Sequence, residues 1–290
     1  MKLNHLVFLL FIMLMYGSSY PVGKLGTNLF SPLLMGSLRA LFLFIAVLPF
    51  FRFSFPKINK LHFLLFCIVM GIGVYSFVYL ALDASSLISP IIIGAQLSVP
   101  FGLILSNFFL QEKISLKKWL LIFSSFIGII IVAYDPRFID QLIGLVFIIL
   151  MALFYAMANI LSRYLKEVST VDQIGWHSLL GFLILFIFSA IVEGNPFDQL
   201  YPFNYNGMIT AFHAGIFVSL IGHGGLFYLY KYYPVAVLLP FYSLFPIFGI
   251  ILTFFIFFEI PGKYEIIGGI IVIGSVCLIH LNDKKTKVSK

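Results

Sequence analysis

Residues 142–162 read LIGLVFIILMALFYAMANILS. This run of 21 residues contains no charged side chain. An α-helix rises about 1.5 Å per residue, so the run would extend about 30 Å, which is the thickness of the hydrocarbon core of a bilayer. The stretch therefore predicts a membrane-spanning helix.

Further apolar runs lie on both sides of this one. They cover roughly residues 5–27, 32–51, 62–82, 89–110, 115–133, 174–192, 208–230, 236–258 and 263–281. The chain is 61% hydrophobic and 10% charged, whereas about 25% of the residues in a soluble domain are charged. Strict alternation of polar and apolar residues, which marks membrane strands, is absent. We therefore predict an all-α membrane protein with ten transmembrane helices and short connections.

The basic residues are unevenly distributed over these connections. With ten helices, both termini and the even-numbered connections lie on one side of the membrane, and they hold fourteen of the 18 Lys and Arg residues. The odd-numbered connections hold two, Arg137 and Lys263. Lys and Arg are enriched in cytoplasmic connections, so we expect both termini to be cytoplasmic. The same pattern explains the net charge of +7 without nucleic acid, and the short connections favour a bacterial cytoplasmic (inner) membrane.

The two halves of the chain resemble each other. In each half a pair of prolines is followed by a glutamate: Pro90, Pro100 and Glu112 in the first, Pro240, Pro246 and Glu259 in the second. The glutamates are 147 residues apart, about half the chain. A duplicated unit of five helices would enter the membrane from opposite sides in its two copies. We therefore predict two inverted five-helix repeats, at residues 1–135 and 141–282, followed by a basic cytoplasmic tail at 283–290.

A set of short motifs follows the same plan. They are YGSSYPVGK at 16–24, Ser31-Pro32, Leu38-Arg39, YLAL at 79–82, Ala95-Gln96, Pro100, QEK at 111–113, YSLFP at 242–246 and Phe258-Glu259. Together they resemble the drug/metabolite transporter superfamily, in its EamA-type branch. The chain departs from that pattern at Tyr16, where Trp is usual, and at Gln111 and Phe258, where Gly is frequent.

This resemblance carries functional expectations. It implies a secondary transporter, and more specifically an exporter of amino acids or related metabolites. It also implies alternating access through a central cavity. The same superfamily includes carriers of sugar phosphates and nucleotide sugars, so an organic-anion carrier is the alternative.

Two cations fall inside predicted helices, where a charge is costly and therefore a functional candidate. Lys24 lies near the outer end of the first helix, so it could reach the interface or pair within the protein instead of binding substrate. Arg39 lies about 10 Å deep in the second helix. Neither has a carboxylate at similar depth in the sequence. We therefore expect an anionic or zwitterionic substrate to meet Lys24 or Arg39.

Neutral polar residues complete the predicted cavity. Gln96 and Asn159 lie near helix centres, and His177 and His223 could couple transport to protons. For each, hydrogen bonding between helices is the alternative interpretation. The cavity set is Lys24, Arg39, Tyr16, Tyr79, Gln96, Asn159, His177, His223 and Tyr242. Pro100 and Pro246 are predicted gating hinges because proline bends a helix.

Other classes of function fit less well. No His-Glu-x-x-His motif and no pair of membrane carboxylates is present, so an intramembrane enzyme is not expected. The sequence contains no selectivity-filter motif, so a channel is not expected. The two cysteines, Cys67 and Cys277, lie in apolar runs, so we expect neither a metal nor a cofactor. Ser124 and Gly128 could mediate a homodimer, although packing within one bundle is the alternative.

Overall fold

The computed structural model describes residues 1–53, 55, 60–165, 167–230, 232–233 and 238–288. All regular structure in these residues is helical, as predicted. The start of the predicted run 236–258 and the last two residues of the predicted tail lie outside the described residues. The helix α15 continues through the earlier part of that tail, to Val288.

The helices follow the predicted runs. In the first half they are α1 (Leu3–Thr27), α2 (Pro32–Val47), η1 (Leu48–Phe50), α3 (Lys60–Ile68), η2 (Val69–Val74), α4 (Tyr75–Asp83), α5 (Ser89–Ala95), α6 (Ser98–Leu110) and α7 (Leu116–Ala133). In the second half they are η3 (Ile139–Gln141), α8 (Leu142–Tyr164), α9 (Thr170–Val192), α10 (Pro196–Leu200), α11 (Tyr205–Phe212), η4 (His213–His223), α12 (Gly224–Tyr230), η5 (Leu239–Ser243), α14 (Leu244–Phe257) and α15 (Lys263–Val288).

Eight helices in the described part of the chain are long and apolar enough to cross a membrane. A shorter apolar helix covers Phe241–Phe257, and α15 packs along α7. In lipid every backbone polar group needs a partner within the protein, which helices provide. The all-α membrane architecture is therefore confirmed, while the count of ten spans stays a prediction.

The helices around the centre are irregular in both halves. The segments η2 and η4 are π-helical, and they occupy corresponding places in the two halves. A turn of two residues, Gln96 and Leu97, separates α5 from α6, and the short 3-10 helix η5 precedes α14. π-Helical segments occur frequently at functional sites. Helix geometry thus departs from the regular form at matching places of the two halves.

The ends of α6 and α14 also match. Gln111 and Phe258 follow these helices and adopt left-handed backbone conformations, with φ of 55° and 54°. This region costs little only for glycine. The requirement explains why glycine is frequent there in the family that the chain resembles, and both departures sit at equivalent positions.

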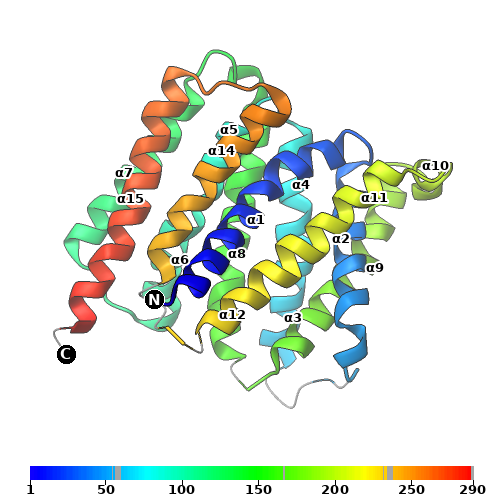
Figure 1. The fold of residues 1–290 in the computed structure, drawn as a ribbon, viewed down its shortest axis with the longest axis horizontal. Coiled ribbons are helices and arrows are strands. Elements are labelled where there is room, and N and C mark those ends of the chain that lie inside the picture. Colours follow the sequence, from blue (N-terminus) through cyan, green and yellow to red (C-terminus); the bar gives the residue numbers. More distant parts are fainter. Residues whose placement is uncertain (54, 56–59, 166, 231, 234–237, 289–290) are drawn as a thin grey trace.

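Glycines allow close approach of helices that Figure 1 shows side by side. A Cβ atom on Gly17 of α1 would lie 2.6 Å from the Phe245 carbonyl oxygen of α14. On Gly128 of α7, a Cβ atom would lie 2.9 Å from the Gly268 carbonyl oxygen of α15. Gly128 therefore packs within the bundle, which is the alternative considered above.

Candidate functional site

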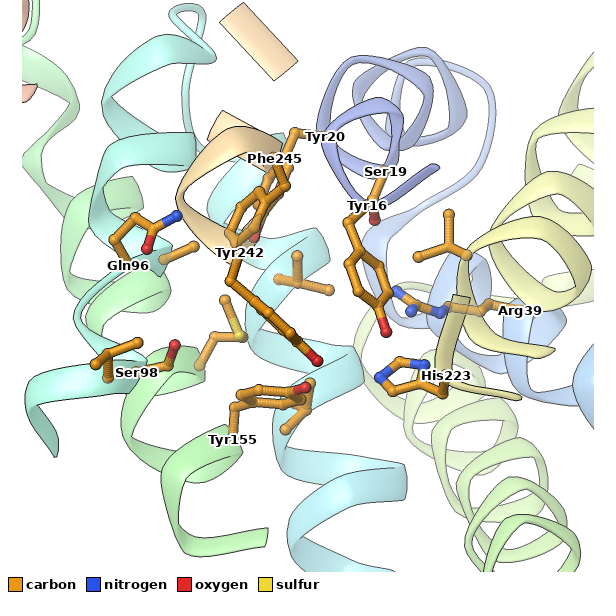
Figure 2. Close-up of a pocket in the computed structure, with 16 residues that line it drawn as sticks. Tyr16, Ser19, Tyr20, Arg39, Gln96, Ser98, Tyr155, His223, Tyr242 and Phe245 are labelled. Carbon is orange, nitrogen blue, oxygen red and sulfur yellow. The ribbon is translucent and has the colours of Figure 1, made fainter. Parts of the chain in front are cut away.

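A central cavity of about 770 Å³ lies among the irregular helices. Figure 2 shows the residues that line it, which come from α1, α2, η2, α4, the α5–α6 break, α8, η4, η5 and the start of α14. A second cavity of about 620 Å³ adjoins it, because Tyr155 and His223 line both. Concave, mostly apolar cavities with a few polar groups are the usual form of small-molecule sites.

Arg39 provides the charge of the central cavity. Its side chain is buried, and its Nε and Nη2 atoms donate to Ser219 Oγ at 3.1 and 3.0 Å. The guanidinium carbon lies 4.6 Å from the centroid of the Tyr75 ring. Among the described residues no carboxylate lies within 4 Å of Arg39. A buried cation held by neutral groups is suited to an incoming anion.

Two histidines flank this arginine. His177 Nδ1 lies 2.8 Å from the Gln173 carbonyl oxygen, and His223 Nδ1 lies 3.0 Å from the Ser219 carbonyl oxygen. A carbonyl only accepts, so each Nδ1 carries a proton. In the neutral rings Nε2 is then an acceptor. In His177 this atom lies 3.3 Å from the Tyr75 hydroxyl, which can donate to it.

Gln96 and Tyr242 line the cavity at the breaks of their helices. Each precedes a proline, Pro100 or Pro246, by four residues. Proline lacks the N–H that would bond to the carbonyl four residues earlier. The Gln96 carbonyl accepts from the Val99 N–H instead, and the Tyr242 carbonyl from the Leu244 N–H. The two prolines therefore open the helix where a side chain meets the cavity.

The remaining predicted residues are distributed more widely. Asn159 and His177 line the second cavity, whereas Tyr16 lines the central one. Tyr79 lines neither cavity, but it is fully buried between α1 and α2 and its hydroxyl accepts a hydrogen bond from Arg39. Lys24 lines neither cavity. Its Nζ atom donates to the Leu82 carbonyl oxygen at 2.7 Å, near the end of α4.

Tyr155 and Ser219 are among the residues at the site that were not predicted. Tyr155 lines both cavities, and Ser219 accepts the hydrogen bonds of Arg39. Tyr155 precedes Asn159 by four residues, and Ser219 precedes His223 by four. Residues four apart share one face of a helix. That spacing would have identified Tyr155 on α8, but η4 is π-helical, so it could not select Ser219.

The second cavity extends toward one end of the bundle. Its lining includes Ser162 and Thr170, which flank the connection between α8 and α9. We call this the terminal end, because α1 begins and α15 ends there (Figure 1). We call the opposite end, where α1 ends and α2 begins, the distal end.

Two partly buried glutamates join helices at the distal end. Glu259 accepts from the N–H groups of Ile88 and Ser89, each at 2.8 Å, at the start of α5. Glu193 accepts from the hydroxyl of Ser31 at 2.6 Å and from the N–H groups of Leu33 and Leu34 at 2.8 and 3.2 Å. A carboxylate at a helix N-terminus is stabilising.

An ion-pair cluster lies beyond the membrane-spanning part of α7. Arg137 donates to Asp135 at 3.0 Å and to Glu265 at 2.9 Å. It also donates to the Ile260 carbonyl oxygen at 3.1 Å. The hydrogen bonds from Arg137 hold the pKa of Asp135 below its usual value. The cluster ties the connection after α7 to the start of α15.

Comparison with known proteins addresses what this architecture is for. The EamA-like transporter family matches the chain twice, over residues 4–134 and 142–281. The chain belongs to the EamA-like transporter family. This places it in the drug/metabolite transporter superfamily and makes it a multi-pass membrane transporter. The predicted resemblance is therefore confirmed.

Relatives of this EamA-like chain include transporters with and without a named substrate. It is 23% identical over 216 residues to the uncharacterized transporter YoaV of Bacillus subtilis, covering 69% of this chain and 73% of that protein. It is 28% identical over 201 residues to an S-adenosylmethionine uptake transporter of Rickettsia felis, covering 67% of this chain and 63% of that protein. The corresponding Rickettsia bellii transporter is 25% identical, with 83% and 85% covered.

A solved crystal structure has the same fold. It superposes with a TM-score of 0.64 and covers 99% of both chains at 14% sequence identity. At this identity the likeness concerns the fold of the EamA-like chain and leaves its substrate open.

Proposed function

We propose that this chain is a secondary transporter of amino acids or their derivatives, and that Arg39 binds the carboxylate of the substrate. The observation that carries the proposal is a buried guanidinium in a cavity, held by Ser219 and Tyr75 without a carboxylate among the described residues. Guanidinium groups bind carboxylates through paired hydrogen bonds. The tyrosine rings of the cavity suit the apolar or cationic parts of such a molecule.

The charge of the cavities favours a carboxylate over a phosphate. Arg39 is the one Lys or Arg among the described residues that line the two cavities. A phosphate group carries about two negative charges near neutral pH, whereas a carboxylate carries one. We therefore rank amino acids and their derivatives above sugar phosphates and nucleotide sugars. The Rickettsia relatives named for S-adenosylmethionine, an amino-acid derivative, support the same ranking.

The proposed mechanism is alternating access between the halves 1–135 and 141–282, with Pro100 and Pro246 as hinges. We place both termini in the cytoplasm of a bacterial inner membrane, so the second cavity faces the cytoplasm. His177 and His223 are the candidate proton carriers beside Arg39. The family favours export, whereas the Rickettsia relatives are named for uptake. The direction of net transport is therefore to be measured in the assay.

The test uses purified protein in proteoliposomes, with two labelled probes: L-methionine as the short probe and S-adenosylmethionine as the long probe. We expect saturable uptake, and a pH gradient that accelerates it would support proton coupling. Arg39→Gln should lower kcat/KM by about 10- to 100-fold, because a hydrogen bond to a charged group contributes about 1.5–3 kcal/mol. Arg39→Lys keeps the charge but loses the forked geometry of the guanidinium, so its kcat/KM should lie between those of the wild type and Arg39→Gln.

The matched control is Arg163→Gln. Arg163 is an exposed arginine whose pairing with Glu112 lies at the molecular surface, so its loss should leave uptake within about twofold. Wild-type uptake that persists unchanged in folded Arg39→Gln would exclude Arg39 as the anion site. Absence of uptake of either probe by the wild type would exclude this substrate class.

A further inference from the structure

Gln96 stands apart from the other buried polar groups of the central cavity. Its side chain is 2% exposed, and its Nε2 atom has no hydrogen-bond partner among the described residues. Its backbone is already satisfied, because the N–H donates to Ile93 and the carbonyl accepts from Val99. The carboxamide is therefore not needed to hold the break between α5 and α6. A buried donor without a partner is unfavourable unless something else supplies an acceptor.

Gln96 and Arg39 define two poles of the same cavity. Figure 2 shows them on opposite sides, with the rings of Tyr16, Tyr155 and Tyr242 between them. One pole is a cation, and the other is a neutral N–H donor. The surface between the poles is aromatic. Such a site matches a molecule with an anion at one end and a hydrogen-bond acceptor at the other.

We propose that Gln96 is a specificity-determining residue that donates its Nε2–H to an acceptor atom at the far end of the substrate. This rests on the proposed function, in which Arg39 binds the carboxylate. The substrate class is then an amino-acid derivative whose side chain ends in a ring nitrogen, carbonyl or hydroxyl, with a flat or apolar middle between the tyrosines. A short amino acid fills the Arg39 pole and leaves Gln96 unpartnered. Sites built to hydrogen-bond a group discriminate strongly against ligands without it.

The first experiment needs no substrate and compares Gln96→Leu with Ser89→Ala by thermal unfolding in detergent. Ser89 is a matched control: it is fully buried on α5, its Oγ atom also has no partner, and it lines neither cavity. Both variants should unfold at or above the wild-type Tm, because the donor group that each substitution removes makes no hydrogen bond within the described protein. A fall of several degrees for Gln96→Leu alone would show that the protein itself uses the carboxamide, and would overturn the proposal.

The second experiment measures KM in proteoliposomes for L-methionine and for its S-adenosyl derivative, which share the carboxylate and differ at the far end. The wild type should prefer the long probe by about 10-fold or more. Gln96→Leu should abolish that preference and leave the KM of the short probe within about twofold. Ser89→Ala should keep the preference. Arg39→Gln should raise the KM of both probes.

Each other result is informative. Equal losses for both probes in Gln96→Leu would make Gln96 a residue that shapes the helix break, and would overturn the proposal. Equal KM values for the two probes in the wild type would do the same while leaving the carrier function intact. If the wild type moves neither probe, the proposed function fails, and the role of Gln96 fails with it.

Discussion

The helices α6 and α14 occupy the same place in the two halves but are packed differently. The offset of 147 that relates Glu112 to Glu259 also relates Gly102 of α6 to Gly249 of α14. A Cβ atom on Gly249 would lie 3.1 Å from the Gly17 carbonyl oxygen of α1, whereas one on Gly102 would meet no atom within 4 Å. At this position α14 lies in close contact with α1, whereas α6 faces open space.

The glutamates that follow these helices differ in the same sense. Glu259 caps α5, a helix of the other half, with two backbone hydrogen bonds. Glu112 pairs with Arg163, and about half of each side chain is exposed. Identical halves in one conformation would be symmetric. Under the proposed mechanism of alternating access, such asymmetry is expected of a state that is closed at one end and accessible from the other.

The largest expected effect comes from breaking the tight contact. Gly17→Ala places a methyl group against backbone atoms of Phe245 and Gly249, at 2.6 and 2.7 Å. Backbone cannot yield as a side chain can, so we expect a loss of about 2–3 kcal/mol in unfolding free energy. Thermal unfolding in detergent measures it. A Tm equal to that of the wild type would show that α1 and α14 are not in close contact.

A smaller effect is expected from the glutamate caps. Glu259→Gln keeps the shape but removes the charge that α5 binds, and should cost about 1–2 kcal/mol. Glu112→Gln is the matched variant and should cost at most about 0.5 kcal/mol, because exposed ion pairs contribute little. Chemical denaturation of the two variants side by side tests the comparison. Equal losses would mean that the two ends are equally closed.

The open position at Gly102 of α6 offers a different test. Gly102→Ala meets no atom in this state, and alanine favours a helix by up to about 1 kcal/mol, so stability should be kept or slightly raised. Transport should nevertheless slow by about fivefold, equivalent to about 1 kcal/mol. The reason is that, under the proposed mechanism, α6 packs in the opposite state as α14 does here. Turnover in proteoliposomes measures this, and unchanged turnover would contradict the exchange of roles.

The smallest expected effect is on the stability of the protein at low pH. Arg137 holds the pKa of Asp135 below its ordinary value of 3.8. A carboxylate whose pKa is lower in the folded state contributes stability that is fully present above the unfolded value. That contribution is lost as pH falls through the folded value, so Tm should decline below about pH 4. Asp135→Asn should flatten this part of the Tm profile between pH 5 and 3. Identical Tm profiles for the wild type and Asp135→Asn would show that the ion-pair cluster around Arg137 does not contribute to stability.

Much of the fold followed from the sequence. In lipid a long uncharged run has few alternatives to a helix, because its backbone groups must be paired internally. The spacing of Glu112 and Glu259 indicated the duplication before any contact was known. Arg39 was a candidate because a charge within an apolar run needs a reason.

The tertiary structure decided which polar residues meet. Lys24 and Arg39 were both candidates in the sequence, yet of the two only Arg39 lines the cavity, whereas Lys24 binds the end of α4. The π-helix η4 and the proline breaks change which face of a helix points inward, so regular spacing could not select Ser219 or the orientation of Gln96. Glu259 and the start of α5 are about 170 residues apart in the chain. Such pairs arise only from packing between helices. Local sequence therefore determined the helices, and the contacts between distant helices determined the site.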